Sequence, residues 1–139
     1  MRGKVSFEYD PDLNVVFTED DWHVKTREDV KAFFAEYEKY FSALGKKVYM
    51  ISHIDNLLVQ AQVAEYFGEL ARLHVYKHLQ GFARWGTNSW ARMTVRTTSH
   101  IAKMTPNIYI TREEAIAAIK GMRNAGLKPE LTPEKTGLT

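Results

Sequence analysis

The feature that most constrains the fold is an alternation of strand-length and helix-length apolar patterns behind an opening hairpin. Residues 4–9 alternate apolar and polar side chains, which predicts a half-buried strand. The turn-forming residues 10–12 follow, and residues 13–18 predict a second strand, so the two strands are expected to pair antiparallel. Residues 22–24 either extend this second strand or follow it.

The first predicted helix covers residues 26–44 and has recognisable signals at both ends. Thr26 begins it, and Asp29 lies three residues on, close to the arrangement of a capping box. Aromatic and aliphatic residues then recur at helical spacing with charged residues largely between them. Gly45 is expected to end the helix in a left-handed conformation.

Three further helices are predicted. The apolar spacing places two of them over residues 59–79 and 90–99. Thr111 and Glu114 form a full capping box at the start of the last helix, and Gly126 is expected to end it.

Short apolar segments between these helices predict the remaining strands, at residues 48–51, 81–85 and 107–110. Residues 52–56 are interpreted as a polar loop after the third strand. The resulting order is β-β-α-β-α-β-α-β-α. Such alternation predicts an α/β fold with a mixed sheet, in which an antiparallel hairpin precedes parallel neighbours covered by helices.

The length of 139 residues corresponds to one domain, expected over residues 1–125. Residues 126–139 contain two prolines and two glycines without apolar periodicity, and we expect a frayed tail there. No signal peptide or membrane span is predicted, and we expect a cytoplasmic protein.

The absence of cysteine excludes disulfides, a thiolate zinc site and a cysteine nucleophile, and it fits a reducing compartment. The net charge of +2 conceals an asymmetry between the two halves of the chain. Residues 1–70 hold 13 acids and 8 bases, whereas residues 71–139 hold 4 acids and 11 bases. Between Glu69 and Glu113 there is no acid, and such an imbalance attracts anions where the bases share a face.

Three segments resemble the STAS fold of anti-sigma-factor antagonists, and in particular its SpoIIAA-like branch. They are the hairpin with the helix at 26–44, the helix-to-strand segment at 74–86, and the strand and capped helix start at 107–115. The resemblance covers residues 4–125 and implies a regulatory module without enzymatic activity. The SpoIIAA-like branch is also akin in fold to CRAL-TRIO lipid-binding domains, which implies a small apolar ligand as a second possibility.

One departure from the family pattern concerns phosphorylation. Family members that act as switches carry a phosphorylatable serine after the third strand. Here Asp55 matches the aspartate of that motif, but Asn56 and Leu57 stand where the serines would be. No serine or threonine follows Ser52 until Thr87, which argues against a kinase-driven switch.

Ligands of open α/β sheets bind at the carboxyl ends of the parallel strands, so the candidate site is placed at the loops after the third and fourth strands. One loop is expected to face the other, with two arginines as anion contacts. The candidate ligand-binding residues are Ser52, His53, Asp55, Asn56, Arg84, Trp85, Thr87, Asn88 and Arg92.

Several of these residues have alternative interpretations. His53 with Ser52 or Asp55 would suit a hydrolase or transferase, although residues this close in sequence rarely align as a triad. A simpler interpretation is that Asp55 or Asn56 caps the next helix. Residues 86–89 either bind an anion on free backbone N–H groups or only cap a helix.

Two further constellations are weaker. His74 and His78 are four residues apart on a predicted helix, but no third metal ligand has a suitable spacing. Aromatic residues near bases suggest stacking on single-stranded nucleic acid, although no nucleic-acid motif accompanies them. They are Tyr76, Phe82, Trp85 and Trp90.

The sequence thus favours a non-enzymatic regulatory or binding module that acts through a protein partner or a small ligand. We expect no metal and no cofactor, and we expect a homodimer. The first alternative is a carrier or sensor of a lipid or other apolar anion in a strand-end pocket. The second alternative is an enzyme using His53.

Overall fold

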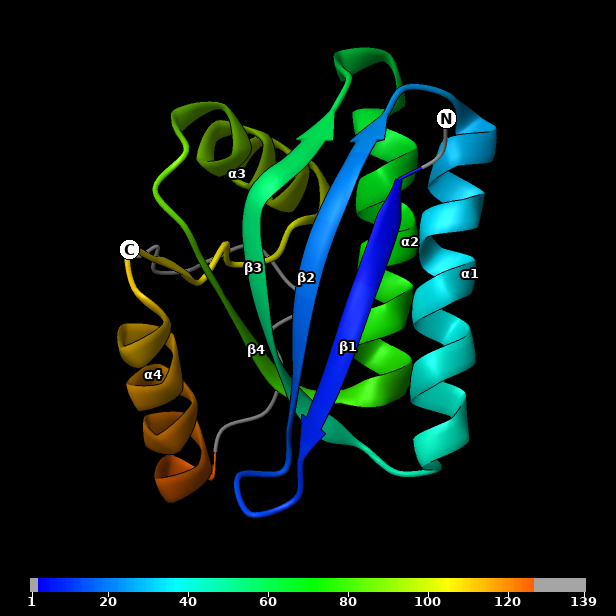
Figure 1. Cartoon of the computed structure of the whole chain (residues 1–139). Helices are drawn as coiled ribbons and strands as arrows, with labels where there is room; N and C mark the ends of the chain where they lie inside the picture. Colours follow the sequence, from blue (N-terminus) through cyan, green and yellow to red (C-terminus); the bar gives the residue numbers. More distant parts are fainter. Residues whose placement is uncertain (1–2, 127–139) are drawn as a thin grey trace.

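The computed structural model describes residues 3–126, which form one five-stranded sheet and four helices (Figure 1). The strands are β1 (Lys4–Asp10), β2 (Val15–Val24), β3 (Val48–Val59), β4 (Leu79–Trp85) and β5 (Ile108–Tyr109). The helices are α1 (Arg27–Leu44), α2 (Ala64–His78), α3 (Ser89–Ala102) and α4 (Arg112–Ala125), and a 3-10 turn, η1 (Ala61–Val63), precedes α2.

The strands lie in the sheet in the same order as in the chain, β1-β2-β3-β4-β5. β1 and β2 are antiparallel, and every other neighbouring pair is parallel. Each parallel connection contains a helix, as parallel pairing requires. The predicted α/β class, the mixed sheet with its opening hairpin and the order β-β-α-β-α-β-α-β-α are therefore confirmed.

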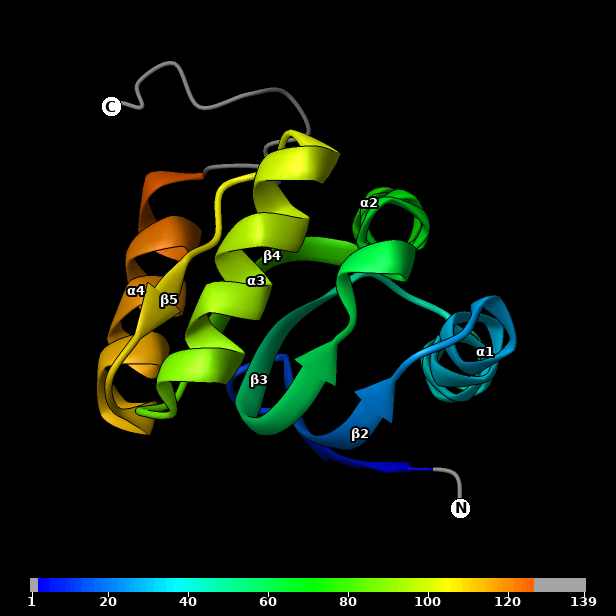
Figure 2. The same ribbon diagram turned by 90° about the horizontal axis from the view of Figure 1, so that it is seen from above.

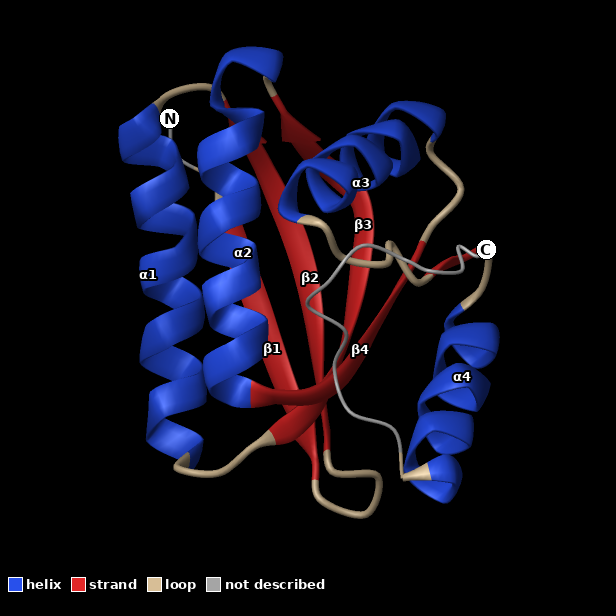
Figure 3. Cartoon of the chain, turned by 180° about the vertical axis from the view of Figure 1, so that it is seen from behind, coloured by secondary structure: helices blue, strands red, loops and turns tan. Residues whose placement is uncertain are grey.

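The helices divide between the two faces of the sheet. α1 and α2 lie side by side along the strands on one face, and α3 lies across the strands on that same face (Figures 2 and 3). α4 packs on the opposite face against β3 and β4. Since α4 covers only one side of that face, part of β1 and β2 stays uncovered (Figure 1).

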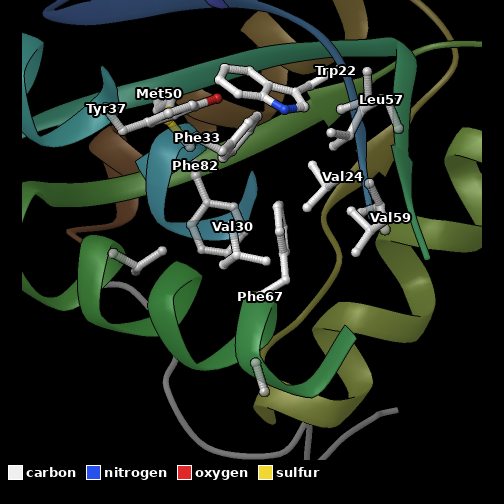
Figure 4. Packing of buried hydrophobic residues seen from close by; sticks show 14 of the residues in the cluster. Trp22, Val24, Val30, Phe33, Tyr37, Met50, Leu57, Val59, Phe67 and Phe82 are labelled. Carbon is white, nitrogen blue, oxygen red and sulfur yellow. The ribbon is translucent and has the colours of Figure 1, made fainter. Parts of the chain in front are cut away.

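The larger core lies between the sheet and α1, α2 and α3, and it is rich in aromatic rings (Figure 4). Phe33 packs edge-on against Trp22 of β2 and contacts Phe67 of α2. Tyr37 stacks parallel to Phe41 one turn further along α1. These side chains are at most 7% exposed, so the helical spacing of aromatic residues in α1 forms the main core contact.

The capping signals are confirmed. The Thr26 hydroxyl accepts the Asp29 amide proton at 3.0 Å, and the Asp29 carboxylate accepts the amide of Thr26 in return. The Thr111 and Glu114 side chains form the same reciprocal pair at α4. Gly45 has a φ of 69° at the end of α1, a left-handed conformation that glycine adopts without steric cost.

The prediction of a polar loop at residues 52–56 is wrong. These residues continue β3, which runs for 12 residues. β2 reaches Val24 and offers backbone partners to β3 as far as Val59, so the polar stretch is held in the sheet from the side. Long-range pairing therefore overrides the local preference of polar residues for a loop.

Other boundaries shift for related reasons. Residues 22–24 belong to β2, which settles the alternative left open for them. The helix predicted from residue 59 begins only at Ala64, because Val59 still pairs with Val24. The last strand is shorter than predicted, and the expected tail beyond Gly126 lies outside the described residues.

We expect Phe41→Ala to lower the free energy of unfolding by about 3–5 kcal/mol, because Phe41 is 1% exposed and its removal leaves a cavity. Urea unfolding at equilibrium measures this change. Tyr76→Ala is the matched control, since Tyr76 is 67% exposed and its loss should cost no more than about 0.5 kcal/mol. Similar losses for the two variants would contradict the described core.

Candidate functional site

The strand character of residues 52–56 separates the candidate residues onto two faces of the sheet. Neighbouring residues of a strand point to opposite faces, so Ser52 and His53 point away from each other. Ser52 belongs to the face covered by α1, α2 and α3, and Arg84 of β4 lines a cavity on that same face. His53 and Trp85 lie on the other face. The expectation that these residues face one another is therefore wrong for Ser52 and Arg84, whereas His53 does face Trp85, and Asp55 does contact Thr87 and Asn88.

On the helix-covered face, β2, β3 and α1 bring four polar side chains into contact. The Tyr37 hydroxyl donates to Asp20 Oδ1 at 2.5 Å. The Thr18 hydroxyl lies 3.2 Å from the same carboxylate oxygen and 2.8 Å from Ser52 Oγ. These four side chains are at most 5% exposed, so they form one buried hydrogen-bonded cluster.

The Asp20 carboxyl of this cluster has a perturbed pKa. Burial raises this pKa from 3.8 to about 6, although the hydrogen bonds from Tyr37 and Thr18 and the charge of Arg84 act in the opposite direction. Asp20 lies at an irregularity of the β2–β3 ladder, where one residue of β2 stands opposite two of β3. Such bulges re-aim side chains and are common beside functional sites.

Arg84 supplies a positive charge to the same region. Its guanidinium donates to the Pro106 carbonyl at 2.8 Å and lies 4.7 Å from the centre of the Phe82 ring. Burial lowers its pKa to about 10, so it stays protonated at neutral pH. Asp20 and Arg84 line one cavity, yet within the described chain no ion pair of 4 Å or less joins them.

The cavity between the sheet and the three helices has a volume of about 40 Å³. On the helix side its wall is mainly apolar and includes Phe33, Phe34 and Val95. Since one water needs at least ~10–15 Å³ of such space, the cavity holds only a few waters in this conformation.

Two buried polar atoms at this cavity have no hydrogen-bond partner among the described residues: Nε2 of His74 and Oγ of Ser99. Burial lowers the pKa of His74 to about 3, and the charge of His78 acts in the same direction, so the ring is neutral at pH 7. Buried polar groups are nearly always hydrogen-bonded, so two such atoms without partners beside a cavity indicate a place for water or a ligand.

On the opposite face, His53 lies between two carboxylates. Its Nδ1 is 2.8 Å from Glu19 Oε1 and its Nε2 is 3.1 Å from Asp55 Oδ2. The ring stacks on Trp85 with centroids 4.0 Å apart. Partial burial acts to lower the pKa of His53, but the two carboxylates outweigh it and the pKa is raised, which favours the imidazolium.

Asp55 connects His53 to the start of α3. Its Oδ1 accepts the backbone N–H groups of Thr87 and Asn88 at 2.7 and 2.8 Å. Gly86 permits this approach, because a Cβ there would lie 2.4 Å from Asp55 Oδ1. The interpretation that Asp55 or Asn56 caps the helix after β3 is therefore wrong, because no side chain caps η1 or α2, and Asp55 instead binds the loop before α3.

The remaining candidates serve the local structure. The Asn88 side chain accepts the Ala91 amide at 2.9 Å and caps α3. Arg92 donates to the carbonyls of Gly86 and Tyr109, both at 2.9 Å, and so holds the loop to β5. Asn56 is exposed beyond the irregular part of the β2–β3 ladder. Arg92 therefore does not join Arg84 as a second anion contact.

The alternative chemistries are met only in part: His53 lies 3.1 Å from Asp55 and lines a pocket with Trp85. Ser52 is 2% exposed and on the face opposite His53, so the two form no nucleophile–base pair. His78 is bonded to Glu38 at 2.8 Å, and residues 3–126 contain no group of three side chains placed to hold a metal ion. Phe82 is 1% exposed, which removes it from any stacking surface.

Sequence reasoning missed five residues that line or support the cavity, namely Thr18, Asp20, Tyr37, His74 and Ser99. A signal for the first two was present. In β2 the residues that face the core are every second one from Val16 to Val24, and Thr18 and Asp20 occupy two of these positions. Polar residues in the apolar phase of a strand indicate a buried polar cluster.

Comparison with known proteins adds no identification: no protein-family model matches the chain, and a search of curated proteins finds no match. Among residues 3–126, no helix has the length and apolar character needed to cross a membrane.

We expect Asp20→Asn to remove a pH-dependent destabilisation. The pKa of Asp20 is about 6 in the folded chain and 3.8 in the reference state, so the folded state holds its proton more tightly. Raising the pH from 4 to 7 should therefore lower the unfolding free energy of the wild type relative to Asp20→Asn by about 2 kcal/mol.

Urea unfolding at a series of pH values measures this difference. Asp21→Asn, at the exposed neighbouring position, is the matched control and should differ from the wild type by no more than about 0.5 kcal/mol at any pH. Parallel pH profiles for the wild type and Asp20→Asn would show that Asp20 does not titrate as a buried carboxyl.

Proposed function

We propose that this protein is a non-enzymatic binding module, related to the SpoIIAA-like STAS proteins, that holds a small ligand in the cavity between its sheet and α1, α2 and α3. The observation that carries the proposal is a buried carboxyl, Asp20, and a half-buried guanidinium, Arg84, that line one mainly apolar cavity without a direct ion pair. A buried carboxylate that has no ion pair is costly, so a group that bridges Asp20 and Arg84 would stabilise the folded chain.

The lining defines the chemistry of the ligand. Apolar side chains form most of the cavity wall, which suits an aliphatic or aromatic body. A head group that accepts from both Arg84 and the protonated Asp20 carboxyl suits the polar end, and a carboxylate is the simplest such group, since burial already raises the pKa of Asp20 to about 6. This ligand falls in the class of apolar anions, so the carrier or sensor alternative is the form of the proposal that the cavity supports best.

The cavity must widen to accept such a ligand, since about 40 Å³ holds only waters. Met50 and Met104 line it, and methionine side chains change rotamer easily. Phe34 is only partly buried where α1 meets α2 and also lines a wider groove of about 540 Å³ on the outside of these helices. Movement of Phe34 would therefore join the cavity to this outer groove.

Two further observations favour ligand binding over the other roles. Ser52, the serine nearest to the position of the family's phosphorylation site, is 2% exposed and hydrogen-bonded, which is unfavourable for a kinase substrate. Both ring nitrogens of His53 face carboxylates, which leaves neither poised as a general base.

A cytoplasmic location and a homodimer complete the proposal.

The first test is native mass spectrometry of protein purified without added ligand, followed by the denatured mass. Under the proposal the native species is a dimer that carries extra mass, and this mass is lost on denaturation. A covalent increase of about 80 Da would instead indicate phosphorylation and would contradict a purely ligand-operated module.

The second test uses octanoic acid as a defined apolar anion. We expect saturable binding by calorimetry, with amide chemical-shift changes at Ser52, Arg84 and Ser99 around the cavity. Arg84→Gln should weaken binding about tenfold or more, because a charge-assisted hydrogen bond is lost. Arg112→Gln, on the opposite face of the sheet, should leave binding unchanged.

The proposal fails if no extra mass is found on the native protein and octanoic acid gives neither heat nor shifts at these residues. Equal losses for Arg84→Gln and Arg112→Gln would place binding elsewhere. A thermal unfolding scan of each variant distinguishes lost binding from lost folding.

A further inference from the structure

The outer side of α3 carries an exposed apolar stripe that the core does not use. Trp90, Met93 and Ile101 are 68%, 51% and 38% exposed. With Thr97 they follow one another at spacings of three, four and four residues, which places them along one line of the helix. The buried side of the same helix, including Val95 and Ala102, faces the sheet and α2.

A basic stripe runs beside this apolar stripe. Arg92, Arg96, His100 and Lys103 recur at spacings of four, four and three residues. Arg92 is bonded to two backbone carbonyls, whereas Arg96 and Lys103 are exposed. The chain has no acid between Glu69 and Glu113, so every formal charge on α3 is positive.

A groove borders the apolar stripe on its other side. It has a volume of about 340 Å³ and lies between α3 and the segment that joins β3 to α2. Its lining is mainly apolar and includes Leu58, Ala61 and Ala64 opposite Trp90 and Met93. The apolar surface of α3 is thus continuous with a recess wide enough for part of an aliphatic chain.

We propose that the outer face of α3 docks on an anionic lipid surface. A helix that lies in the plane of a bilayer places tryptophan and aliphatic residues at the headgroup boundary and arginine and lysine beside the phosphates. The two stripes of α3 have this arrangement, and a surface of uniform negative charge matches a helix whose charges all have one sign. Trp90, Met93 and Ile101 enter the bilayer boundary, while Arg96 and Lys103 contact the phosphates.

This inference does not depend on the interior ligand, although the two sites are adjacent. Thr98 of α3 lines both the cavity and the groove between α3 and the segment that joins β3 to α2. A surface-bound α3 would therefore bring the cavity close to a source of apolar molecules.

Co-sedimentation of the full chain with lipid vesicles tests the proposal. We expect binding to vesicles of phosphatidylcholine with 30% phosphatidylserine and much weaker binding to phosphatidylcholine alone. The binding should fall as the salt concentration rises, since part of the attraction is electrostatic. Equal binding to both vesicle types, or to neither, would overturn the proposal.

Substitutions then locate the contact. Arg96→Gln with Lys103→Gln should weaken binding about fivefold for each charge removed. The control pair Lys39→Gln with Lys120→Gln changes the net charge equally at exposed positions of α1 and α4 and should have little effect. Equal losses for both pairs would indicate attraction by net charge alone and would overturn docking through α3.

Trp90→Ala addresses the apolar stripe, with Tyr76→Ala on α2 as its exposed aromatic control. Only Trp90→Ala should reduce vesicle binding. If Trp90→Ala instead dissociates a dimer while vesicles are not bound, a second copy of the chain covers this face and the proposal is wrong. Binding of a single-stranded oligonucleotide without binding of vesicles would overturn it as well.

Discussion

The pairing of β3 with β2 and β4 is the constraint on which the rest of the structure depends. β3 is held on both sides, and its backbone is extended through Ser52, His53 and Ile54. An extended strand alternates its side chains between two faces, so these neighbours contact different surroundings. The candidate residues therefore form a buried cluster under the helices and a separate histidine–carboxylate group on the other face.

The buried cluster is costly to maintain, which makes it informative. Asp20 is one of four side chains that are hydrogen-bonded to one another, yet burial still raises the pKa of its carboxyl to about 6. An aliphatic residue at position 20 would avoid this cost. The presence of Arg84 at the same cavity, without a direct ion pair in the described chain, favours a ligand-binding role over a purely structural one.

The histidine–carboxylate group has a different character. Asp55 is hydrogen-bonded to Nε2 of His53 and also accepts two backbone N–H groups before α3. This contact orients α3 relative to β3, so the group anchors the helix that carries the exposed apolar and basic stripes. We interpret the group as structural, since both ring nitrogens of His53 already face carboxylates.

Local signals in the sequence determined the hairpin, the capped ends of α1 and α4, the order of the elements and hence the α/β class, because capping, turn formation and apolar periodicity act between residues close in the chain. The same local signals placed Arg84 and Ser52 among the candidate ligand-binding residues. They also assigned His53 and Arg92 to the same site, although these two residues do not line the cavity. The length of β3 was decided by its partner β2, whose paired residues lie more than 30 positions earlier in the chain. Only the tertiary structure decided which face each polar side chain occupies and that Asp20, Tyr37, His74 and Ser99 meet at one cavity, because these residues come from four different elements and their proximity depends on packing across the whole sheet.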